Sequence, residues 1–318
     1  RYQIQPVWRA DRPQKGRFRE FYQCDADVIG SQSLLSEVEL VQLYDKVFTD
    51  LGIPSVIKLN NRKILSGIAE IVGEADKLID ITVAIDKLDK IGLQKVKEEM
   101  QSKGVSDAAI KKLTPILNLQ GDLFEKLLAI SEVLEESVIG LQGVDELKFV
   151  IDKVSSLGLS TAEIDFDLTL ARGLNYYTGS IFEVVCKNVE IGSIGGGGRY
   201  DDLTSIFGLD DMPGIGISFG LERIYLVMEE LDLFPSLHSN FTQVLFVNFG
   251  DKEADYCLRI IKKLRGRGIN AELYPDSFKM KKQMNYANKK AIPYVVLIGE
   301  DEMSSGLFTV KNMNDGTQ

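Results

Sequence analysis

The chain has 318 residues, of which 44% are hydrophobic and 26% charged, and a formal net charge of −10. This length predicts two or three domains, and the acidic balance argues against a generic nucleic-acid coat protein. Because no apolar run is long enough to cross a bilayer and no signal-peptide pattern opens the chain, we expect a cytoplasmic globular protein without a membrane partner.

Residues 1–30 predict a hairpin whose two strands flank a basic loop. Residues 2–8 alternate polar and apolar side chains, residues 20–30 form the return strand, and five of the six cations in the segment lie between Arg9 and Arg19. Several fixed charges on one loop suit a clamp that closes over a triphosphate, and an exposed basic hairpin is the alternative that remains open.

Gln23 and Asp27 lie four residues apart on the return strand, so we expect their side chains on the same face of the sheet. An amide and a carboxylate on one face could bind an amino group or an imidazole N–H. A solvated polar face is the alternative for this pair.

The chain then becomes helical. We expect a helix over residues 31–51, with Ser36 as its cap, and a strand over residues 55–60. Residues 62–157 are rich in Leu, Ile, Lys and Glu, and their apolar residues recur at helical spacing. We interpret them as a helical domain inserted into a β-rich one. We find no catalytic constellation in it and assign its carboxylates to solvated helix faces.

An octapeptide with one arginine and two tyrosines marks the return of the β-rich pattern. It reads Leu-Ala-Arg-Gly-Leu-Asn-Tyr-Tyr, contains Arg172, Tyr176 and Tyr177, and lies between strand-like residues 165–170 and 180–185. Arginine offers a planar cation for a phosphate, and tyrosine offers a flat apolar ring with one hydroxyl. The octapeptide therefore suits a small planar polar ligand beside an anion, although a hairpin with core tyrosines is an open alternative.

Two glycine-rich segments follow. The four consecutive glycines at 195–198 stand in an apolar strand, which indicates that something approaches the backbone closely. In residues 212–220 glycines alternate with apolar residues and lead into a helix over residues 221–231, whose first turn carries Arg223. A flat glycine strand beside a cation suits a planar base, and its order is neither that of a Walker A loop nor that of a Rossmann fingerprint.

The last part of the chain has a β-α-β-α-β pattern. Residues 241–318 are therefore expected to form a small α/β domain with a mostly parallel sheet. They hold 12 Lys and Arg against 9 Asp and Glu, a net charge of +3, while the rest of the chain has −13. This distribution can mark a module that faces nucleic acid, and random charge drift explains it nearly as well.

Histidine and cysteine usage narrows the possible chemistry. His238 is the single histidine and lies in a segment with the composition of a linker, which argues against a histidine general base or a histidine-ligated zinc. Cys24, Cys186 and Cys257 lie far apart, as in a reducing cytosol, and give no disulfide framework. We expect no metal site built from protein ligands.

Taken together, these segments resemble histidyl-tRNA synthetases, which are class II aminoacyl-tRNA synthetases, over essentially the whole chain. Residues 8–30 are similar to the family's motif 2, and the octapeptide at 170–177 is similar to its histidine-specific signature. Residues 195–203 are similar to its glycine strand and residues 214–223 to motif 3. The Arg-Gly-Leu-Asn-Tyr-Tyr signature is highly specific, whereas motif 3 alone indicates only class II.

The resemblance implies an α+β fold. An antiparallel class II sheet with helices would carry a helical insertion and a C-terminal α/β anticodon-binding domain. The implied boundaries are 1–61 and 158–238 for the two parts of the catalytic domain, 62–157 for the insertion and 241–318 for the anticodon-binding domain.

The resemblance also implies an activity. The family activates histidine with ATP to histidyl-adenylate and pyrophosphate, then transfers histidine to the 3′ end of tRNA(His), as a cytoplasmic homodimer that uses Mg²⁺. By resemblance, Arg9 and Arg172 would be the catalytic cations on the α-phosphate. Arg17 and Arg223 would hold the β- and γ-phosphates, and Asp11 would contact the adenosine.

The histidine site implied by the resemblance is polar. Gln23 would contact the amino group, while Asp27 and the two tyrosines would surround the imidazole. The whole implied set consists of Gln23, Asp27, Arg172, Tyr176, Tyr177, Gly195, Gly196 and Gly197, with the glycines as the pocket floor. Catalysis would then need no protein nucleophile, only positioning and electrostatics.

The C-terminal domain stops early at Gln318 compared with the family, and the sequence departs from the family pattern in two further respects. It starts inside motif 2, so motif 1 with its dimer interface is absent and we expect an N-terminally incomplete chain. Asp11 stands where the family usually has glutamate, which would weaken a contact to the adenosine.

The alternative function is that of the synthetase-like regulatory subunit of ATP phosphoribosyltransferase, a histidine sensor; residues 241–318 and Arg172 argue against it. A pure RNA-binding module would leave the glycine and arginine–tyrosine patterns unexplained.

Overall fold

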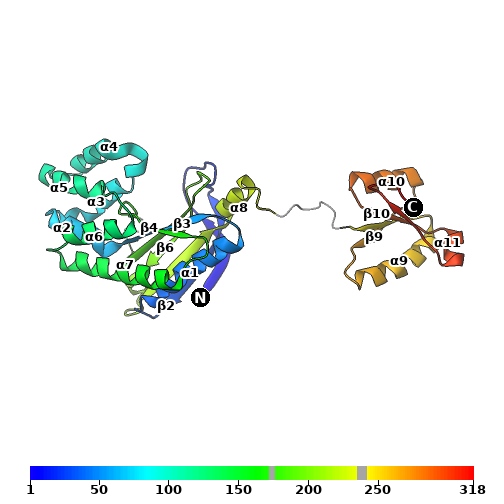
Figure 1. The fold of residues 1–318 in the computed structure, drawn as a ribbon, viewed down its shortest axis with the longest axis horizontal. Helices are drawn as coiled ribbons and strands as arrows, with labels where there is room; N and C mark the ends of the chain where they lie inside the picture. The colour runs from blue at the N-terminus through cyan, green and yellow to red at the C-terminus, as the bar shows by residue number, and fades with distance from the viewer. Residues whose placement is uncertain (172–175, 235–241) are drawn as a thin grey trace. The chain divides into compact units, whose positions relative to one another are not determined.

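The structure is a computed structural model that describes residues 1–171, 176–234 and 242–318. Arg172 and His238 therefore lie outside the described residues. The chain forms two compact units, residues 1–233 and 234–318, and each unit has its own sheet (Figure 1). None of the described helices is long and apolar enough to cross a membrane.

The first unit is built on a seven-stranded sheet with the order β1-β2-β7-β6-β5-β3-β4. Its strands are β1 (Tyr2–Trp8), β2 (Glu20–Ile29), β3 (Ser55–Asn61), β4 (Glu163–Phe166), β5 (Ser180–Cys186), β6 (Ser193–Arg199) and β7 (Gly214–Gly220). All neighbouring strands are antiparallel except β3 and β4, which are parallel. The predicted hairpin and glycine strands thus become neighbours in one sheet, and the expected antiparallel α+β fold is confirmed.

One face of this sheet is covered by helices. The covering helices are α1 (Leu35–Asp50), α7 (Val138–Leu157) and α8 (Leu221–Glu230). Tyr44 and Phe48 of α1 are fully buried, and their ring centroids lie 5.0 and 5.7 Å from that of Phe219 on β7. Because alternate residues of a strand point to opposite faces, this packing leaves Gly214, Gly216, Ser218 and Gly220 for the other face.

Helix α1 begins differently from the sequence expectation. Its N-cap residue is Leu34, whose side chain makes no capping hydrogen bond, and Ser36 lies inside the first turn. Ser33 Oγ accepts a hydrogen bond of 3.3 Å from the Leu35 backbone N–H and partly replaces the missing cap. The predicted cap at Ser36 is therefore wrong by two residues, a common error at helix ends.

The segment between β3 and β4 is helical, as expected. Its helices before α7 are α2 (Arg62–Ile71), α3 (Leu78–Ile85), α4 (Leu88–Ser102), α5 (Asp107–Leu117) and α6 (Leu123–Val133), with a short 3₁₀ turn at Ala75–Lys77. Helices α2 and α7 pack against each other and on β3, whereas α3, α4 and α5 gather at one end of the unit (Figure 1). A Cβ on Gly67 would lie 2.5 Å from Cα of Gly140, so these two glycines permit the close approach of α2 and α7.

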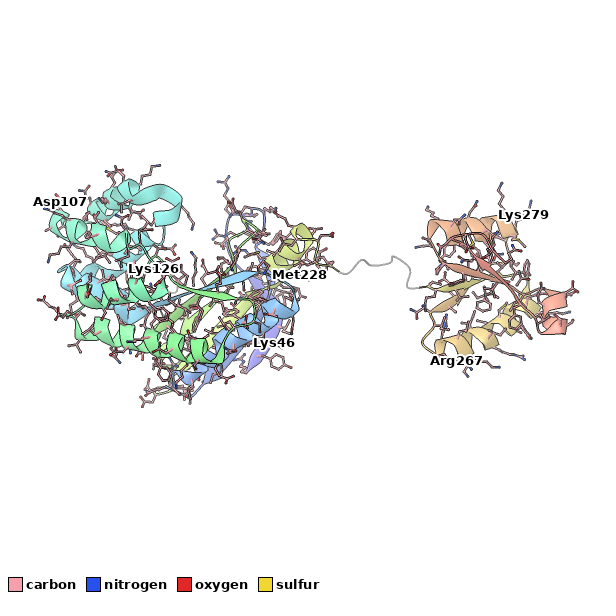
Figure 2. The ribbon with its side chains drawn as sticks, viewed as in Figure 1. Lys46, Asp107, Lys126, Met228, Arg267 and Lys279 are labelled. Atoms are coloured by element: carbon pink, nitrogen blue, oxygen red, sulfur yellow. The ribbon has the colours of Figure 1, made fainter. Side chains whose placement is uncertain are left out.

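One ion pair and one hydrogen bond of Lys126 join helix α6 to the edge of the sheet. Lys126, labelled in Figure 2, lies 2.7 Å from Asp165 Oδ1 and donates to the Phe166 carbonyl at 3.2 Å. Strand β4 ends at Phe166, earlier than predicted, because Asp167 Oδ1 accepts from the backbone N–H of Thr169 at 2.9 Å and bends the chain.

The second unit has a four-stranded sheet with the order β11-β10-β8-β9. Its elements are β8 (Val244–Phe246), α9 (Asp251–Arg265), β9 (Ala271–Leu273), α10 (Met280–Lys289), β10 (Tyr294–Leu297), α11 (Glu300–Ser305) and β11 (Thr309–Asn312). Strands β8, β9 and β10 are parallel, and β11 is antiparallel. The predicted α/β pattern is confirmed, and α11 is a short helix that was not predicted.

Candidate functional site

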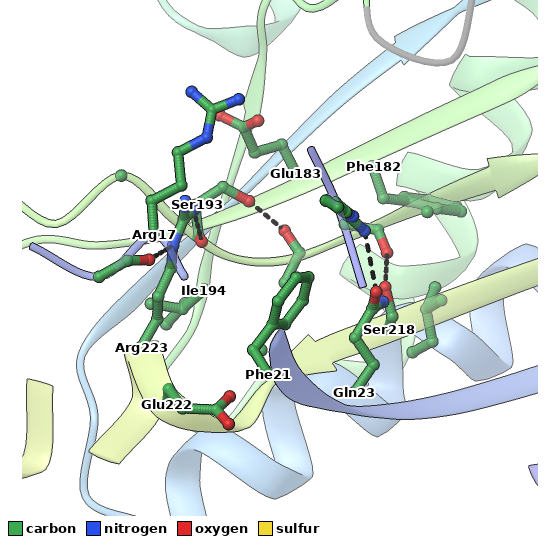
Figure 3. A pocket seen from close by; sticks show the side chains of 18 of the residues that line it. Arg17, Phe21, Gln23, Phe182, Glu183, Ser193, Ile194, Ser218, Glu222 and Arg223 are labelled. Carbon is green, nitrogen blue, oxygen red and sulfur yellow. Dashed lines mark hydrogen bonds between the residues drawn. The ribbon is translucent and has the colours of Figure 1, made fainter. Parts of the chain in front are cut away.

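A cavity of about 1030 Å³ opens on the uncovered face of the first sheet (Figure 3). Its walls come from the hairpin loop, strands β2, β5, β6 and β7, and the start of helix α8. Every described residue of the predicted sites lines it: Arg9, Asp11, Arg17, Gln23, Asp27, Tyr176, Tyr177, Gly195, Gly196, Gly197 and Arg223. The structure thus brings residues far apart in the sequence into one cavity.

One side of the cavity is basic. Arg223 donates through Nε to the Gly16 carbonyl and through Nη1 to the Ser193 carbonyl, both at 2.6 Å, so it ties the hairpin loop to β6. In Figure 3, Arg17 and Arg223 lie on one side of Phe21, and Gln23 lies on the other. Phe21 therefore separates Arg17 and Arg223 from Gln23.

The hairpin loop has a defined conformation. Gln14 and Arg17 exchange two backbone hydrogen bonds of 3.0 and 2.9 Å around Gly16, whose φ of +70° favours glycine. Arg17 Nη2 lies 2.8 Å from Asp11 Oδ1, and this hydrogen bond lowers the pKa of the Asp11 carboxyl. Arg17 therefore has a carboxylate partner, which partly fixes the direction of its side chain.

Arg9 begins a chain of hydrogen bonds that runs along the polar residues of β2. Its Nη2 donates to Gln23 Oε1 at 2.8 Å, and its guanidinium carbon lies 5.0 Å from the centroid of the Phe21 ring. Gln23 Nε2 donates in turn to Asp25 Oδ1 at 3.2 Å. Both ends of the Gln23 amide are therefore engaged by neighbouring side chains.

The other side of the cavity carries carboxylates and a phenol. Tyr200 donates its hydroxyl to Asp27 Oδ1 at 2.5 Å, and burial together with the Asp27 carboxylate raises the pKa of Tyr200. An added Cβ on Gly216 would lie 2.0 Å from Asp27 Oδ1, and one on Gly214 would lie 2.4 Å from the Tyr200 ring. Part of the glycine strand β7 therefore makes room for this pair of side chains and is not an open platform for a base.

The glycines of β6 serve two purposes. A Cβ on Gly195 would lie 2.7 Å from Tyr44 on the covered face, and one on Gly197 would lie 2.1 Å from the Gly216 carbonyl oxygen. The nearest atom to a Cβ on Gly196 is 3.4 Å away, an ordinary contact. Of the three predicted glycines, Gly196 is thus the one whose missing side chain leaves space in the cavity.

The two tyrosines of the octapeptide lie together at the cavity. Their ring centroids are 4.4 Å apart with an angle of 56° between the planes, and the Tyr177 ring lies 3.0 Å from the position of a Cβ on Gly198. Burial raises the pKa of Tyr177, whereas Tyr176 remains 42% exposed. Tyr177 therefore forms part of a fixed wall, and Tyr176 is accessible to solvent.

Several cavity residues were not singled out from the sequence. Asp25 shares the face of Gln23 and Asp27 by the period of two along a strand, so the alternation could have revealed it. Asp86 and Lys90, from the helical segment, also line the cavity. No sequence signal distinguishes these two from the solvated charges around them, because tertiary packing alone brings the junction of α3 and α4 to the cavity.

No group of three or more His, Cys, Asp or Glu residues within the described ranges could hold a metal ion. In place of such a group, Glu222 offers a single carboxylate oxygen at the cavity. Its Oε1 accepts the Tyr22 backbone N–H at 2.8 Å, while its Oε2 is buried without a hydrogen-bond partner in the described chain. One carboxylate beside phosphate oxygens suits Mg²⁺, which is usually bound through a few protein ligands and the substrate.

The fold and the cavity define a class of protein. An antiparallel sheet with an arginine-bearing hairpin, glycine strands and a separate α/β unit is that of a class II aminoacyl-tRNA synthetase. The chain superposes on a solved histidyl-tRNA synthetase from Nostoc sp. PCC 7120 with a TM-score of 0.84 and 33% identity, over 100% of this chain and 74% of that one. A Bacillus halodurans protein, described as an ATP phosphoribosyltransferase regulatory subunit/histidyl-tRNA synthetase, shares the fold with a TM-score of 0.72 and 20% identity, over 90% of this chain and 70% of that one.

Sequence comparison identifies the family. The profile of histidyl-tRNA synthetases matches residues 2–224, and that of the anticodon binding domain matches residues 243–318. The histidine–tRNA ligases of Christiangramia forsetii and Flavobacterium johnsoniae are 63% and 61% identical to the chain over its whole length, which spans 70% and 67% of theirs. The chain belongs to the histidyl-tRNA synthetase family, and the resemblance found in its motifs is confirmed.

Proposed function

We propose that this chain is the part of a histidine–tRNA ligase that activates histidine and recognises tRNA(His). In the first step a carboxylate oxygen of histidine attacks the α-phosphorus of ATP, and the bond to pyrophosphate breaks. In the second step the 3′-terminal ribose hydroxyl of the tRNA takes the histidyl group and AMP leaves. The observation that carries this proposal is the division of one cavity into an arginine side and a carboxylate–phenol side.

The arginine side would bind ATP. Arg9 would hold the α-phosphate, and Arg17 and Arg223 the β- and γ-phosphates, since arginine binds phosphate through two parallel N–H bonds. Arg223 is already oriented by two carbonyls, so it would meet the phosphates without much reorganisation. Asp11 would position Arg17, while Arg172, outside the described residues, is proposed to stabilise the charge that develops at the α-phosphorus.

The carboxylate–phenol side would bind histidine. Tyr200 occupies one oxygen of Asp27, which leaves the other for an imidazole N–H. Tyr176 and Tyr177 would flank the ring, and Gly196 would leave space beneath it. A site with buried polar groups rejects amino acids that cannot pair with them, because those groups would otherwise stay unsatisfied.

Mg²⁺ belongs to this proposal through the phosphates of ATP. Glu222, with its unpartnered buried oxygen, is the residue that would meet the ion. The ion would neutralise phosphate charge, and the protein's own part is to orient the nucleotide beneath the arginines.

The remaining assignments extend from the family to the complete enzyme. We place the catalytic domain at residues 1–61 and 158–238, the insertion at 62–157 and the anticodon-binding domain at 241–318. Within this insertion, helices α2, α6 and α7 contact strands of the catalytic sheet. The enzyme would be a cytoplasmic homodimer, which sedimentation of the full-length protein tests.

Pyrophosphate exchange tests the function. The full-length enzyme is expected to exchange pyrophosphate into ATP only with L-histidine and Mg²⁺ present, and to charge tRNA(His). Histidine binding without exchange would favour a regulatory subunit that senses histidine. Relatives with 63% identity that carry the ligase name favour exchange.

A further inference from the structure

A buried arginine at the end of β6 connects this strand with the start of α1. Arg199 pairs with Glu37 through two bonds of 2.6 and 2.7 Å, and the two side chains are 5% and 0% exposed. Its remaining N–H groups donate to the Ser31 and Ser33 carbonyls at 3.1 and 3.2 Å and to Asp201 Oδ1 at 3.1 Å. All five N–H donors of the guanidinium are therefore engaged, and none is left for a ligand.

Asp201 extends this network to the octapeptide at residues 170–177. Its Oδ2 accepts from Thr178 Oγ1 at 2.8 Å, and its backbone N–H donates to the same hydroxyl oxygen at 3.0 Å. The Thr178 backbone N–H in turn donates to the Arg199 carbonyl at 2.8 Å. These three bonds hold the chain directly after Tyr177, the last residue of the octapeptide.

Two cavity side chains adjoin this network in the chain. Tyr177 directly precedes Thr178, and its ring lies 3.0 Å from the position of a Cβ on Gly198. Tyr200 directly follows Arg199 and lines the same cavity. Thr178 and Arg199 are not among the residues that line it, so an effect of theirs on a ligand must pass through these neighbours.

We propose that Thr178 is a positioning residue for the substrate histidine, since the bonds of its hydroxyl to Asp201 hold Tyr177 in the cavity wall. This inference rests on the proposed function, in which Tyr177 flanks the imidazole. Gly179 follows Thr178 and restricts the backbone little, so the hydroxyl bonds fix the chain at this point. Without them the Tyr177 ring would adopt more orientations. Histidine would then bind more weakly before and during the reaction alike, which raises KM for histidine and leaves kcat unchanged.

Thr178→Val tests the proposal, because valine keeps the shape of threonine and lacks its hydroxyl. In pyrophosphate exchange by the full-length enzyme, we expect KM for histidine to rise about tenfold, since a hydrogen bond to a charged group is lost. KM for ATP and kcat should stay within about twofold of wild type. Thr178→Ser retains the hydroxyl and should keep KM for histidine within about threefold of wild type.

Thr49→Val is the matched control for a loss of stability. Thr49 belongs to the same unit, its Oγ1 lies 2.7 Å from Thr161 Oγ1, and neither residue lines the cavity. Both valine variants should lower the melting temperature, because each removes a hydroxyl from its hydrogen bonds. Only Thr178→Val should raise KM for histidine.

A double-mutant cycle tests whether Thr178 acts through Asp201. Asp201→Asn removes the charge that accepts the Thr178 hydroxyl. Its effect on KM for histidine should be smaller in the Thr178→Val background than in the wild-type background, because both changes break the same bond. Additive effects would contradict this route of action.

Two further results would overturn the proposal. KM for histidine within about twofold of wild type in Thr178→Val would show that the hydroxyl does not position the wall. An equal rise in Thr49→Val would show a general loosening of the unit. If Thr178→Val does not fold, Thr178→Ala removes the same hydroxyl. A wild-type enzyme without histidine-dependent exchange would contradict the proposed function instead, so the two failures are distinguishable.

Discussion

The two sides of the cavity are built in different ways. On the basic side, Arg9 and Arg17 come from a loop, and their directions depend on bonds to Gln23 and Asp11. On the other side, Asp25 and Asp27 come from the middle of β2, where the strand register fixes their positions. A charged side chain on a loop is held in one direction by its own hydrogen bonds, whereas a charged side chain on a strand is positioned by the register of the sheet.

This difference has a consequence for mutations. Loss of a group on the basic side should affect both ATP binding and the arrangement of the loop. Loss of a side-chain group on the carboxylate–phenol side should weaken the binding of one group of the ligand and leave the rest of the site in place.

Arg172→Ala is expected to have the largest effect. The family resemblance places this arginine at the α-phosphate, where charge develops during adenylate formation, and loss of one such cation costs about 3 kcal/mol in the barrier. Single-turnover adenylate formation should slow by about a hundredfold while histidine binding stays nearly intact. A rate within about twofold of wild type would contradict the assignment.

Arg223→Ala should follow, because it removes a cation and both bonds that tie the loop to β6. We expect KM for ATP to rise about thirtyfold, or roughly 2 kcal/mol, with little change in KM for histidine. Arg12→Ala is the matched control, since Arg12 is an exposed cation of the same loop and is not among the residues that line the cavity. Equal effects of the two variants would mean that the loop acts only through its total charge.

Asp27→Asn tests the carboxylate–phenol side of the cavity. Asparagine keeps the shape but can turn an N–H₂ towards the imidazole N–H, so KM for histidine should rise at least about tenfold, or roughly 1.4 kcal/mol. KM for ATP should hardly change, because Gln23 and Arg9 do not bond to Asp27. Pyrophosphate exchange measures both constants, and a parallel rise in both would break the separation of the two sides.

Asp11→Asn should have the smallest effect. Asp11 pairs with Arg17 at the surface, and exposed ion pairs contribute little to free energy. KM for ATP is therefore expected to change by less than about threefold, and the change should shrink further at high salt. A much larger increase would show that Asp11 has a direct contact to the nucleotide, as the family resemblance implies for this position.

Much of the fold could be predicted from local pattern. The alternation in residues 2–8 and 20–30 predicted β1 and β2, and the helical spacing of residues 62–157 predicted the helices between β3 and β4. Boundaries were less accurate where a side chain intervened: Asp167 ends β4 early by capturing the Thr169 N–H. Such a bond depends on one local conformation and leaves no periodic signal in the sequence.

Only part of the candidate site could be predicted from the sequence. The period of two placed Gln23 and Asp27 on one face, and the motifs selected the arginines, because both signals are local. The sequence could not show that Tyr200 bonds to Asp27, since these residues are 173 positions apart and meet only when β2 and β6 pair with opposite edges of β7. For the same reason nothing in residues 62–157 indicated that Asp86 and Lys90 would line the cavity.

The family, the order of the elements and the residue types available for phosphate and histidine all follow from the chain's local patterns. Tertiary packing, in contrast, decided which glycines leave space for a ligand and which for Tyr44, Asp27 or a neighbouring strand. It also decided that Gln23 is engaged at both ends of its amide, whereas Asp25 and Asp27 are each bonded through one oxygen. The reason is physical: composition and periodicity act along the chain, whereas space and hydrogen-bond partners are supplied by strands distant in sequence that lie side by side in the sheet.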